Sequence, residues 1–235
     1  MISGISLVVP VYNEKEIIEE SLGVFKKSLS GMTDNFEIIV VDDGSNDGTA
    51  EVLSRFCSEE KIKIIHNQQN LGSGMALWRG FQEARYELVM SNFSDRPFDL
   101  DELPRILRIF ARENPDFVVV ARKNRSANPI FRKITSLSNF LLVRMLFGIK
   151  VKDFQFVQVY KKYVLDKIRV ISRHTFVAPE IIIKAVSLGY KYCEYSTDFY
   201  PRKKGRSKYS NPWLIFLSAW EIITFFWQWQ VLKRI

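Results

Sequence analysis

Short apolar runs alternate with longer helix-like stretches along the first half of the chain. The apolar runs are rich in Ile and Val and are of the length expected for buried strands. They are Ile5–Val9, Glu37–Val41, Lys61–Ile65, Glu87–Met90 and Phe117–Ala121. The helix-like stretches between them are Glu14–Leu29, Asp47–Cys57, Gly72–Arg85 and Asp99–Glu113. This alternation predicts an α/β fold, in which helices flank both faces of a mostly parallel, Rossmann-like sheet.

The pattern changes after residue 121. A polar, basic loop at Arg122–Pro129 leads into a strongly apolar helical stretch at Ile130–Phe147. Two further strands and a helix are predicted beyond it: Phe156–Tyr160, Lys191–Phe199 and, for the helix, Pro179–Leu188. We therefore expect one domain over residues 1–211, followed by a separate segment at 212–235.

That last segment is strongly aromatic. Pro212–Leu232 holds four of the five tryptophans, and its one charged residue is Glu221. As a helix it would be about 31 Å long, close to the thickness of a bilayer core. Its polar residues would share one helical face: Ser218, Glu221, Thr224 and Gln228. A polar stripe favours a helix that lies in the membrane interface or packs on a partner. A membrane span and a plain core helix remain alternatives.

Composition narrows the possible partners. With 47% apolar residues the chain can bury a core, which excludes a disordered tail. The net charge of +8 indicates an anionic partner, such as nucleic acid, a nucleotide, a phospholipid or a prenyl phosphate. Nucleic acid is not expected, because the basic residues cluster in loops beside apolar stretches and no aromatic-basic RNA motif is evident.

Three motifs place polar groups at predicted strand ends. The first strand runs into Val9–Glu14, and the second runs into Asp42–Ser45. Ligands of α/β proteins bind at such ends, where carboxylates accept hydrogen bonds from base imino and ribose hydroxyl groups. Asn70–Gly74 then opens a helix that carries Arg79. Its glycines allow close approach of a phosphate, and a helix N-terminus favours negative charge.

In this order and spacing, the motifs resemble the nucleotide-sugar-binding half of the family-two inverting glycosyltransferases, which have the GT-A fold. The resemblance implies a site for a nucleoside diphosphate sugar. Its residues would be Pro10, Tyr12, Glu14, Asp42, Asp43, Asn70, Gly72 and Arg79. Two simpler interpretations stay open: Asn13 as a helix N-cap, and Arg79 as one half of a surface ion pair.

The family's metal-binding motif is altered in this chain. Ser91 and Phe93 stand where the family has an Asp-x-Asp pair, which holds a divalent metal on the diphosphate. The replacement ligands that we consider are Asp95, with Asn92 or Ser94 assisting. Mg²⁺ or Mn²⁺ prefers such oxygen ligands. Alternatively the site binds metal weakly or not at all, and Arg96 supplies part of the positive charge.

The second half resembles the polyprenyl-phosphate branch of the family, such as dolichol-phosphate mannose synthases. The segments that carry this resemblance are Asp153–Phe156, Phe176–Glu180 and Tyr200–Lys208. The implied acceptor-phosphate ligands are Arg122, Arg132, Ser136, Lys204 and Lys208. The catalytic candidates are Asp153, Glu180 and Arg202. The two acids would serve as the base for a glycan hydroxyl, whereas a prenyl phosphate is already nucleophilic and needs no strong base.

We therefore expect inverting transfer of a sugar from a nucleoside diphosphate sugar to a polyprenyl phosphate or glycan acceptor. The protein is expected at the cytoplasmic face of a membrane, either peripheral or anchored by its C-terminal helix, and a homo-oligomer is left open. The rival hypothesis is a non-catalytic nucleotide-binding or membrane-associated assembly subunit. The altered Asp-x-Asp position and the aromatic tail motivate this rival.

Overall fold

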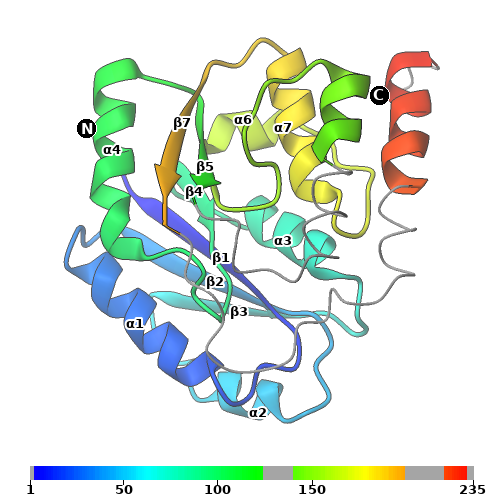
Figure 1. Ribbon diagram of the computed structural model, residues 1–235. Helices are drawn as coiled ribbons and strands as arrows, with labels where there is room; N and C mark the ends of the chain where they lie inside the picture. The colour runs from blue at the N-terminus through cyan, green and yellow to red at the C-terminus, as the bar shows by residue number, and fades with distance from the viewer. Residues whose placement is uncertain (1–2, 124–139, 199–219, 232–235) are drawn as a thin grey trace.

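A seven-stranded sheet forms the centre of the protein in a computed structural model that describes residues 3–123, 140–198 and 220–231. The strands are β1 (Ile5–Val11), β2 (Phe36–Asp42), β3 (Ile62–His66), β4 (Leu88–Ser91), β5 (Phe117–Arg122), β6 (Gln158–Lys161) and β7 (Tyr192–Thr197). Their order is β3-β2-β1-β4-β6-β5-β7 (Figure 1). Neighbouring strands are parallel, except that β6 runs antiparallel to β4 and β5. The predicted α/β fold is confirmed.

Helices cover both faces of this sheet. They are α1 (Ile18–Ser30), α2 (Thr49–Ser54), α3 (Ser73–Gln82), η1 (Leu100–Glu102), α4 (Leu103–Glu113), α6 (Lys162–Asp166) and α7 (Val177–Ser187). On one face Phe25 of α1 and Phe110 of α4 belong to one apolar cluster, and on the other Phe81 of α3 and Ile182 of α7 belong to a second. Every residue of β1 and β2 is buried, which explains their continuous apolar sequences.

Two further helical segments lie against the α7 side of the domain (Figure 1). Residues 140–147 are helical, residues 220–226 are α-helical, and η3 (Trp227–Val231) continues as a π-helix. The Phe225 ring lies 5.5 Å from that of Phe147 and 5.4 Å from that of Phe176. The described part of the C-terminal segment therefore packs on the domain itself. Within the described ranges, no helix is long and apolar enough to cross a membrane.

The start of α1 differs from the sequence-based expectation. The helix begins at Ile18, and its N-cap position is Ile17, so Asn13 is not the N-cap. Asn13 adopts a left-handed backbone conformation with φ of 54°. Its side-chain oxygen accepts a hydrogen bond from the Asn46 backbone N–H at 2.9 Å, and its amide nitrogen donates to Asn46 Oδ1 at 3.0 Å. Asn13 thus joins the β1–α1 loop to the β2–α2 loop.

Two glycines of α3 are required by packing against protein atoms. A Cβ at Gly80 would lie 2.3 Å from Val8 Cγ1 in β1, and a Cβ at Gly74 would lie 1.8 Å from the carbonyl oxygen of His174. Both contacts are far shorter than van der Waals distance. These glycines therefore let α3 lie directly on the sheet and on the segment before α7.

Candidate functional site

The polar residues predicted as site residues gather at one edge of the sheet. The carboxyl ends of the parallel strands meet there, and the residues at these ends are Asp42, His66, Ser91, Arg122 and Thr197. Because β6 is antiparallel, the segment that leads into it reaches the same edge and brings Asp153 beside Arg122. The edge therefore combines residues from both halves of the chain.

Asp43 organises the loop that begins α3. Its carboxylate Oδ1 accepts hydrogen bonds from Asn67 Nδ2 at 2.7 Å and from the Leu71 N–H at 2.9 Å, and Oδ2 accepts from the Gly72 N–H at 2.8 Å. Asp43 is 2% exposed. This carboxylate fixes the Asn70–Gly74 turn, in which Gly72 has a φ of 94° that favours glycine.

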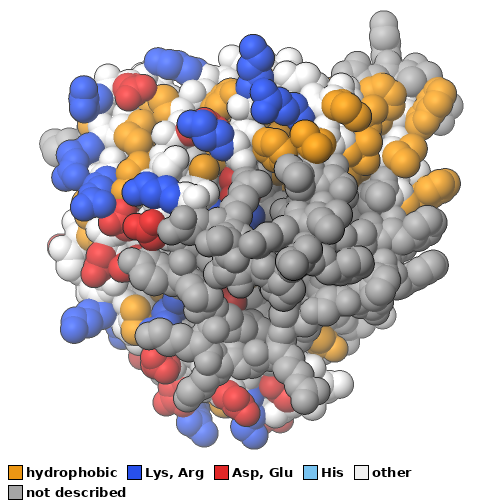
Figure 2. Space-filling model, viewed as in Figure 1, with side chains coloured by type: hydrophobic (Ala, Val, Ile, Leu, Met, Phe, Trp, Pro, Cys, Tyr) orange, Lys and Arg blue, Asp and Glu red, His pale blue; other side chains and the backbone are white. Residues whose placement is uncertain are grey.

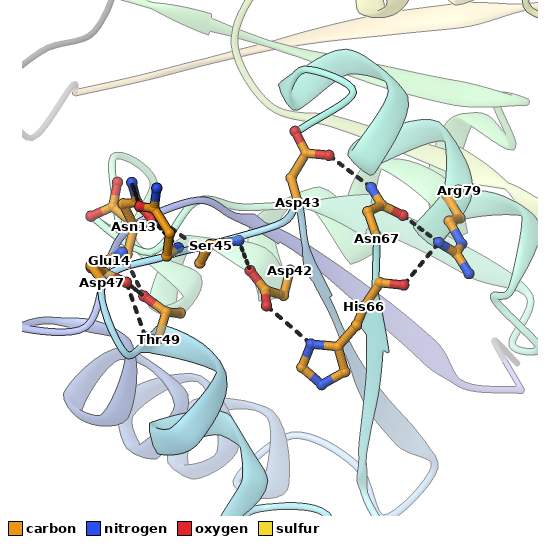
Figure 3. Close-up of polar contacts among 11 residues, drawn as sticks. Asn13, Glu14, Asp42, Asp43, Ser45, Asp47, Thr49, His66, Asn67 and Arg79 are labelled. Atoms are coloured by element: carbon orange, nitrogen blue, oxygen red, sulfur yellow. Dashed lines mark hydrogen bonds and ion pairs between the residues drawn. The ribbon is translucent and has the colours of Figure 1, made fainter. Parts of the chain in front are cut away.

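The neighbouring Asp42 points in a different direction (Figure 3). Its Oδ1 accepts a hydrogen bond from the Ser45 N–H at 3.1 Å, and its Oδ2 lies 3.0 Å from Nδ1 of His66. The His66 side chain is half-exposed. Sequence reasoning missed His66, although its place at the end of the third strand, in register with Asp42, was the available signal.

The β1–α1 loop is held against the β2–α2 loop by a third carboxylate, that of Asp47. Asp47 accepts hydrogen bonds from the side chain and backbone of Thr49 and from the Lys15 N–H, and the Glu14 N–H donates to Thr49 Oγ1 at 3.0 Å. Burial acts to raise the pKa of Asp47, but these hydrogen bonds outweigh burial and hold the pKa below its ordinary value. Pro10 lies buried in β1, and Tyr12 and Glu14 are partly exposed beside this loop.

The arginine of α3 reaches back to the end of β3. Arg79 donates one hydrogen bond to the His66 carbonyl oxygen at 3.2 Å and another to Asn67 Oδ1 (Figure 3). Arg79 is exposed, as is Asn70 at the turn. The guanidinium group is therefore placed by Asn67, the same side chain that donates to Asp43.

At the end of β4 the described residues do not form a protein-built metal site. Asn92 is fully buried, and its side chain bonds within its own loop, to the Phe98 carbonyl oxygen and the Phe93 N–H. Asp95 is partly exposed nearby, and Arg96 pairs with Glu20 at 2.6 Å. No group of three His, Cys, Asp or Glu side chains within the described ranges is arranged to hold a metal.

At the end of β5, Arg122 and Asp153 form a bidentate ion pair. Arg122 Nε lies 2.7 Å from Asp153 Oδ2, and Nη2 lies 3.1 Å from Oδ1. Asp153 is 2% exposed and also accepts a hydrogen bond from the Gln155 N–H. The guanidinium lies over the Phe156 ring, 5.4 Å from its centroid. This geometry fixes the direction of the arginine side chain.

Glu180 lies inside the domain. It is fully buried, and its Oε1 accepts hydrogen bonds from the Ile171 N–H at 2.9 Å and from Lys184 Nζ at 2.8 Å. Its Oε2 accepts from the Ser172 N–H at 2.8 Å. These contacts favour a role in holding the segment before α7 over the role of general base. The remaining predicted residues lie outside the described ranges: Arg132, Ser136, Arg202, Lys204 and Lys208.

Comparison with known proteins supports the family resemblance. The profile of the family described as Glycosyl transferase family 2 matches residues 6–170. Two curated relatives are undecaprenyl-phosphate 4-deoxy-4-formamido-L-arabinose transferases. The protein from Pectobacterium atrosepticum is 32% identical, with 89% of this chain and 63% of the relative covered. The protein from Pseudomonas syringae is 29% identical, with 95% and 65% covered. The chain thus spans about two thirds or less of these relatives' length.

Solved structures confirm a GT-A-like fold. Glucosyl-3-phosphoglycerate synthase from Mycobacterium tuberculosis, solved with Mn²⁺, UDP and glucosyl-3-phosphoglycerate, matches with a TM-score of 0.70 at 19% identity. The match covers 96% of this chain and 79% of that one. S. aureus TarS 1–349 with UDP-GlcNAc matches with a TM-score of 0.63 at 18% identity, covering 94% and 66%. At 18–19% sequence identity, these matches establish similarity of fold alone.

Proposed function

The chain belongs to glycosyl transferase family 2, and on that premise we propose that it transfers a sugar from a nucleoside diphosphate sugar to a polyprenyl phosphate, with inversion. The single observation that carries the proposal is the carboxyl edge of the sheet. On that edge Asp42 and Asp43 lie on one side, and the paired Arg122 and Asp153 lie on the other. The names of the curated relatives favour a polyprenyl phosphate over a glycan acceptor.

The donor side is built from the loops after β1, β2 and β3. In our proposal Asp42 accepts hydrogen bonds from the base or ribose, beside Pro10, Tyr12 and Glu14. In this proposal the Asn70–Gly72 turn and the N-terminus of α3 face the diphosphate, because the positive end of a helix dipole favours an anion. Asp43 holds that turn directly, and Arg79 acts on it through Asn67, which donates to Asp43.

The acceptor side centres on Arg122. Its guanidinium would bind oxygens of the acceptor phosphate while Asp153 holds it in position. One phosphate oxygen attacks the anomeric carbon, forming a carbon–oxygen bond as the bond to the diphosphate breaks and the diphosphate leaves with the electron pair. The oxyanion is already nucleophilic, so no general base is required. Arg132, Ser136, Arg202, Lys204 and Lys208 stay predictions for the same phosphate.

The proposal includes a divalent ion, for which Asp95 is the candidate protein ligand. We propose that Mg²⁺ or Mn²⁺ is bound mainly by the donor diphosphate, with Asp95 as a protein ligand. Calorimetry of nucleoside diphosphate binding with and without Mn²⁺ tests this expectation. A metal-dependent gain in affinity that Asp95→Asn abolishes would support it, and equal affinity with EDTA would contradict it.

An exposed apolar surface suits a lipid acceptor. Residues 140–147 and the C-terminal helix lie side by side and turn large apolar side chains outward (Figure 2). They are Leu141, Met145, Trp220, Ile223 and Trp227, which we call the apolar face. Exposed Arg144 lies on the same surface segment. Tryptophan favours the membrane interface, and basic residues favour anionic lipid. We propose that the apolar face rests on the cytoplasmic leaflet.

The membrane part is tested with vesicles of anionic phospholipid. Changing Trp220, Ile223 and Trp227 together to Ser should reduce co-sedimentation with the vesicles. Val24→Ser is the matched control, since Val24 is an exposed apolar residue on α1, on the opposite side of the sheet. Equal vesicle binding by the triple variant would contradict the proposed surface.

The catalytic part is tested by turnover. Labelled nucleotide sugars are supplied with undecaprenyl phosphate, and labelled lipid is measured for the unaltered protein and for Arg122→Ala. Labelled lipid from the unaltered protein supports the proposal. The rival, a non-catalytic nucleotide-binding subunit, is motivated by Ser91 and Phe93 at the Asp-x-Asp position. Nucleoside diphosphate binding without turnover for any donor would favour that rival.

A further inference from the structure

Two carboxylates from two helices hold four consecutive backbone amides. In the segment before α7, Glu180 accepts from the N–H groups of Ile171 and Ser172. Glu221, from the C-terminal helix, accepts from the next two, those of Arg173 and His174, both at 3.1 Å. Residues 171–174 are therefore clamped from two directions. Charge-assisted hydrogen bonds of this kind are stronger than neutral ones.

Glu221 makes a second contact to His174, through the histidine ring. Its Oε1 also lies 2.9 Å from Nδ1 of His174, so this oxygen accepts from both the backbone and the ring of one histidine. Its Oε2 is buried and has no hydrogen-bond partner within the described residues. A partly buried carboxylate bonded through a single oxygen is costly to keep. Within the described residues, the hydrogen bonds of the Glu221 carboxylate all go to Arg173 and His174.

Residues 173 and 174 of this segment lie in close contact with the start of α3. The position of a Cβ on Gly74 lies 1.8 Å from the His174 carbonyl oxygen, and that of a Cβ on Gly72 lies 3.4 Å from the Arg173 carbonyl oxygen. On its other side this turn is bound by Asp43, through the N–H groups of Leu71 and Gly72. The turn is thus held between a donor-site carboxylate and a backbone that Glu221 positions.

We propose that Glu221 is a positioning residue for the donor site, acting through His174 on the diphosphate-facing turn at Gly72–Gly74. The inference rests on the proposed function of that turn. Glu221 would also connect the donor site to the apolar face, because it lies on the helix that carries Trp220 and Trp227. The C-terminal helix is then part of donor binding as well as a contact surface.

The test uses two measurements on each variant. Calorimetry gives the affinity for UDP, GDP, ADP, CDP and dTDP, and steady-state kinetics gives the KM values for donor and acceptor. Glu221→Ala should weaken nucleoside diphosphate binding and raise the donor KM about five- to tenfold. The kcat value and the acceptor KM should change less than about twofold. Glu221→Gln keeps the accepting Oε1 and should restore binding. Thr224→Ala is the matched control one turn away, because Thr224 Oγ1 bonds to carbonyl oxygens of its own helix.

A second variant probes the other side of the same contact. Gly74→Ala should also weaken nucleoside diphosphate binding, and its effect should not add to that of Glu221→Ala, since both disturb one contact. If the unaltered protein binds none of UDP, GDP, ADP, CDP and dTDP, the proposed function is overturned and this inference with it. If it binds and Glu221→Ala binds equally well, this inference alone is overturned. A lowered Tm with unchanged nucleotide affinity likewise overturns it. Should Glu221→Ala fail to fold, His174→Ala replaces it. The expected result is the same: weaker nucleotide binding and a higher donor KM, with little change in kcat and in the acceptor KM.

Discussion

Arg122 and Asp153 are paired through two separate contacts, of 2.7 Å and 3.1 Å, at the carboxyl edge of the sheet. The arginine side chain is 16% exposed and the aspartate 2%. The two residues are 31 positions apart in the sequence, so no local pattern predicts that they pair. The pair assigns different tasks to two residues that were both predicted for the site: the arginine faces the edge, and the aspartate holds it.

The first prediction separates these two tasks. Arg122→Ala leaves the buried Asp153 without its guanidinium and should lower the free energy of unfolding by about 3–5 kcal/mol. Arg122→Lys keeps the charge but cannot form the bidentate contact, so it should recover part of that stability while acceptor use stays low. Urea unfolding and the acceptor KM measure the two effects. Equal acceptor kinetics for Arg122→Lys and the unaltered protein would count against Arg122 as the phosphate ligand.

The second prediction concerns helix packing. Gly80→Ala places a methyl group 2.3 Å from Val8 Cγ1, inside the sheet contact of α3. Overpacking of this kind should cost about 1–3 kcal/mol in the free energy of unfolding. Gly23→Ala is the control, since no atom lies within 4 Å of a Cβ there and alanine favours a helix. That variant should be as stable as the unaltered protein or up to about 1 kcal/mol more stable. Equal Tm values for both variants would refute the packing argument.

The third prediction distinguishes the adjacent aspartates. Asp43→Ala removes the acceptor for three donors, so it should lower stability by about 2–5 kcal/mol and abolish nucleoside diphosphate binding. Asp42→Asn retains an oxygen for the Ser45 N–H and should cost less than about 1 kcal/mol. It should still reduce nucleotide affinity about tenfold, because an amide is a weaker acceptor than a carboxylate. Calorimetry and urea unfolding together check the pair. If Asp42→Asn leaves the nucleotide affinity unchanged, Asp42 does not bind the base or ribose.

The fourth prediction is a pH dependence at Asp47. The pKa of Asp47 lies below its ordinary value of 3.8, because hydrogen bonds from Thr49 and Lys15 outweigh the effect of burial. Since the unfolded chain binds this proton more tightly, the contribution to stability is present above pH 3.8 and is lost as the pH falls through the folded pKa. Between pH 5 and pH 3 the unaltered protein should therefore lose more stability than Asp47→Asn.

Urea midpoints at pH 5, 4 and 3 measure this difference. Thr49→Ala is the companion variant, because it removes the hydroxyl that lowers the pKa and should shrink the acid-range loss. The same slope for all three proteins would show that Asp47 is not held as described.

Much of the fold follows from local pattern. The strands β1 to β5 coincide with the predicted apolar runs to within two residues. The match is expected for β1, β2 and β4, because strands buried on both faces have continuous apolar sequences. The start of α1 was missed, since Asn13 has the residue type of an N-cap but forms a left-handed turn four residues earlier. The position of β6 between β4 and β5 is a long-range feature that no local pattern encodes.

The site was predictable in part for the same reason. Motif position predicted Asp42, Asp43 and Arg79 for the candidate site, and the structure places them near one another. It did not show that Asp43 bonds to the Asn70–Gly74 turn while Asp42 pairs with His66. These partners lie 24 or more residues away and depend on strand register. Glu221 was noted from sequence as part of a polar stripe. Its contact to residues 173–174 depends on how distant helices pack, which residue spacing does not specify.

The proposed donor and acceptor sides come from separate parts of the chain, although the antiparallel β6 brings both to one edge of the sheet. The residues that we propose for the donor site, with Asp95 for its ion, fall between Pro10 and Asp95, upstream of β5. The Arg122–Asp153 pair and the two helices of the apolar face fall downstream of residue 116. A chimera joined in the loop after α4 would therefore exchange one half of the chemistry while keeping the other. Glu221 is the exception, because it reaches across that join. Such a chimera should retain its original donor preference when the C-terminal half supplied still carries a carboxylate at this position.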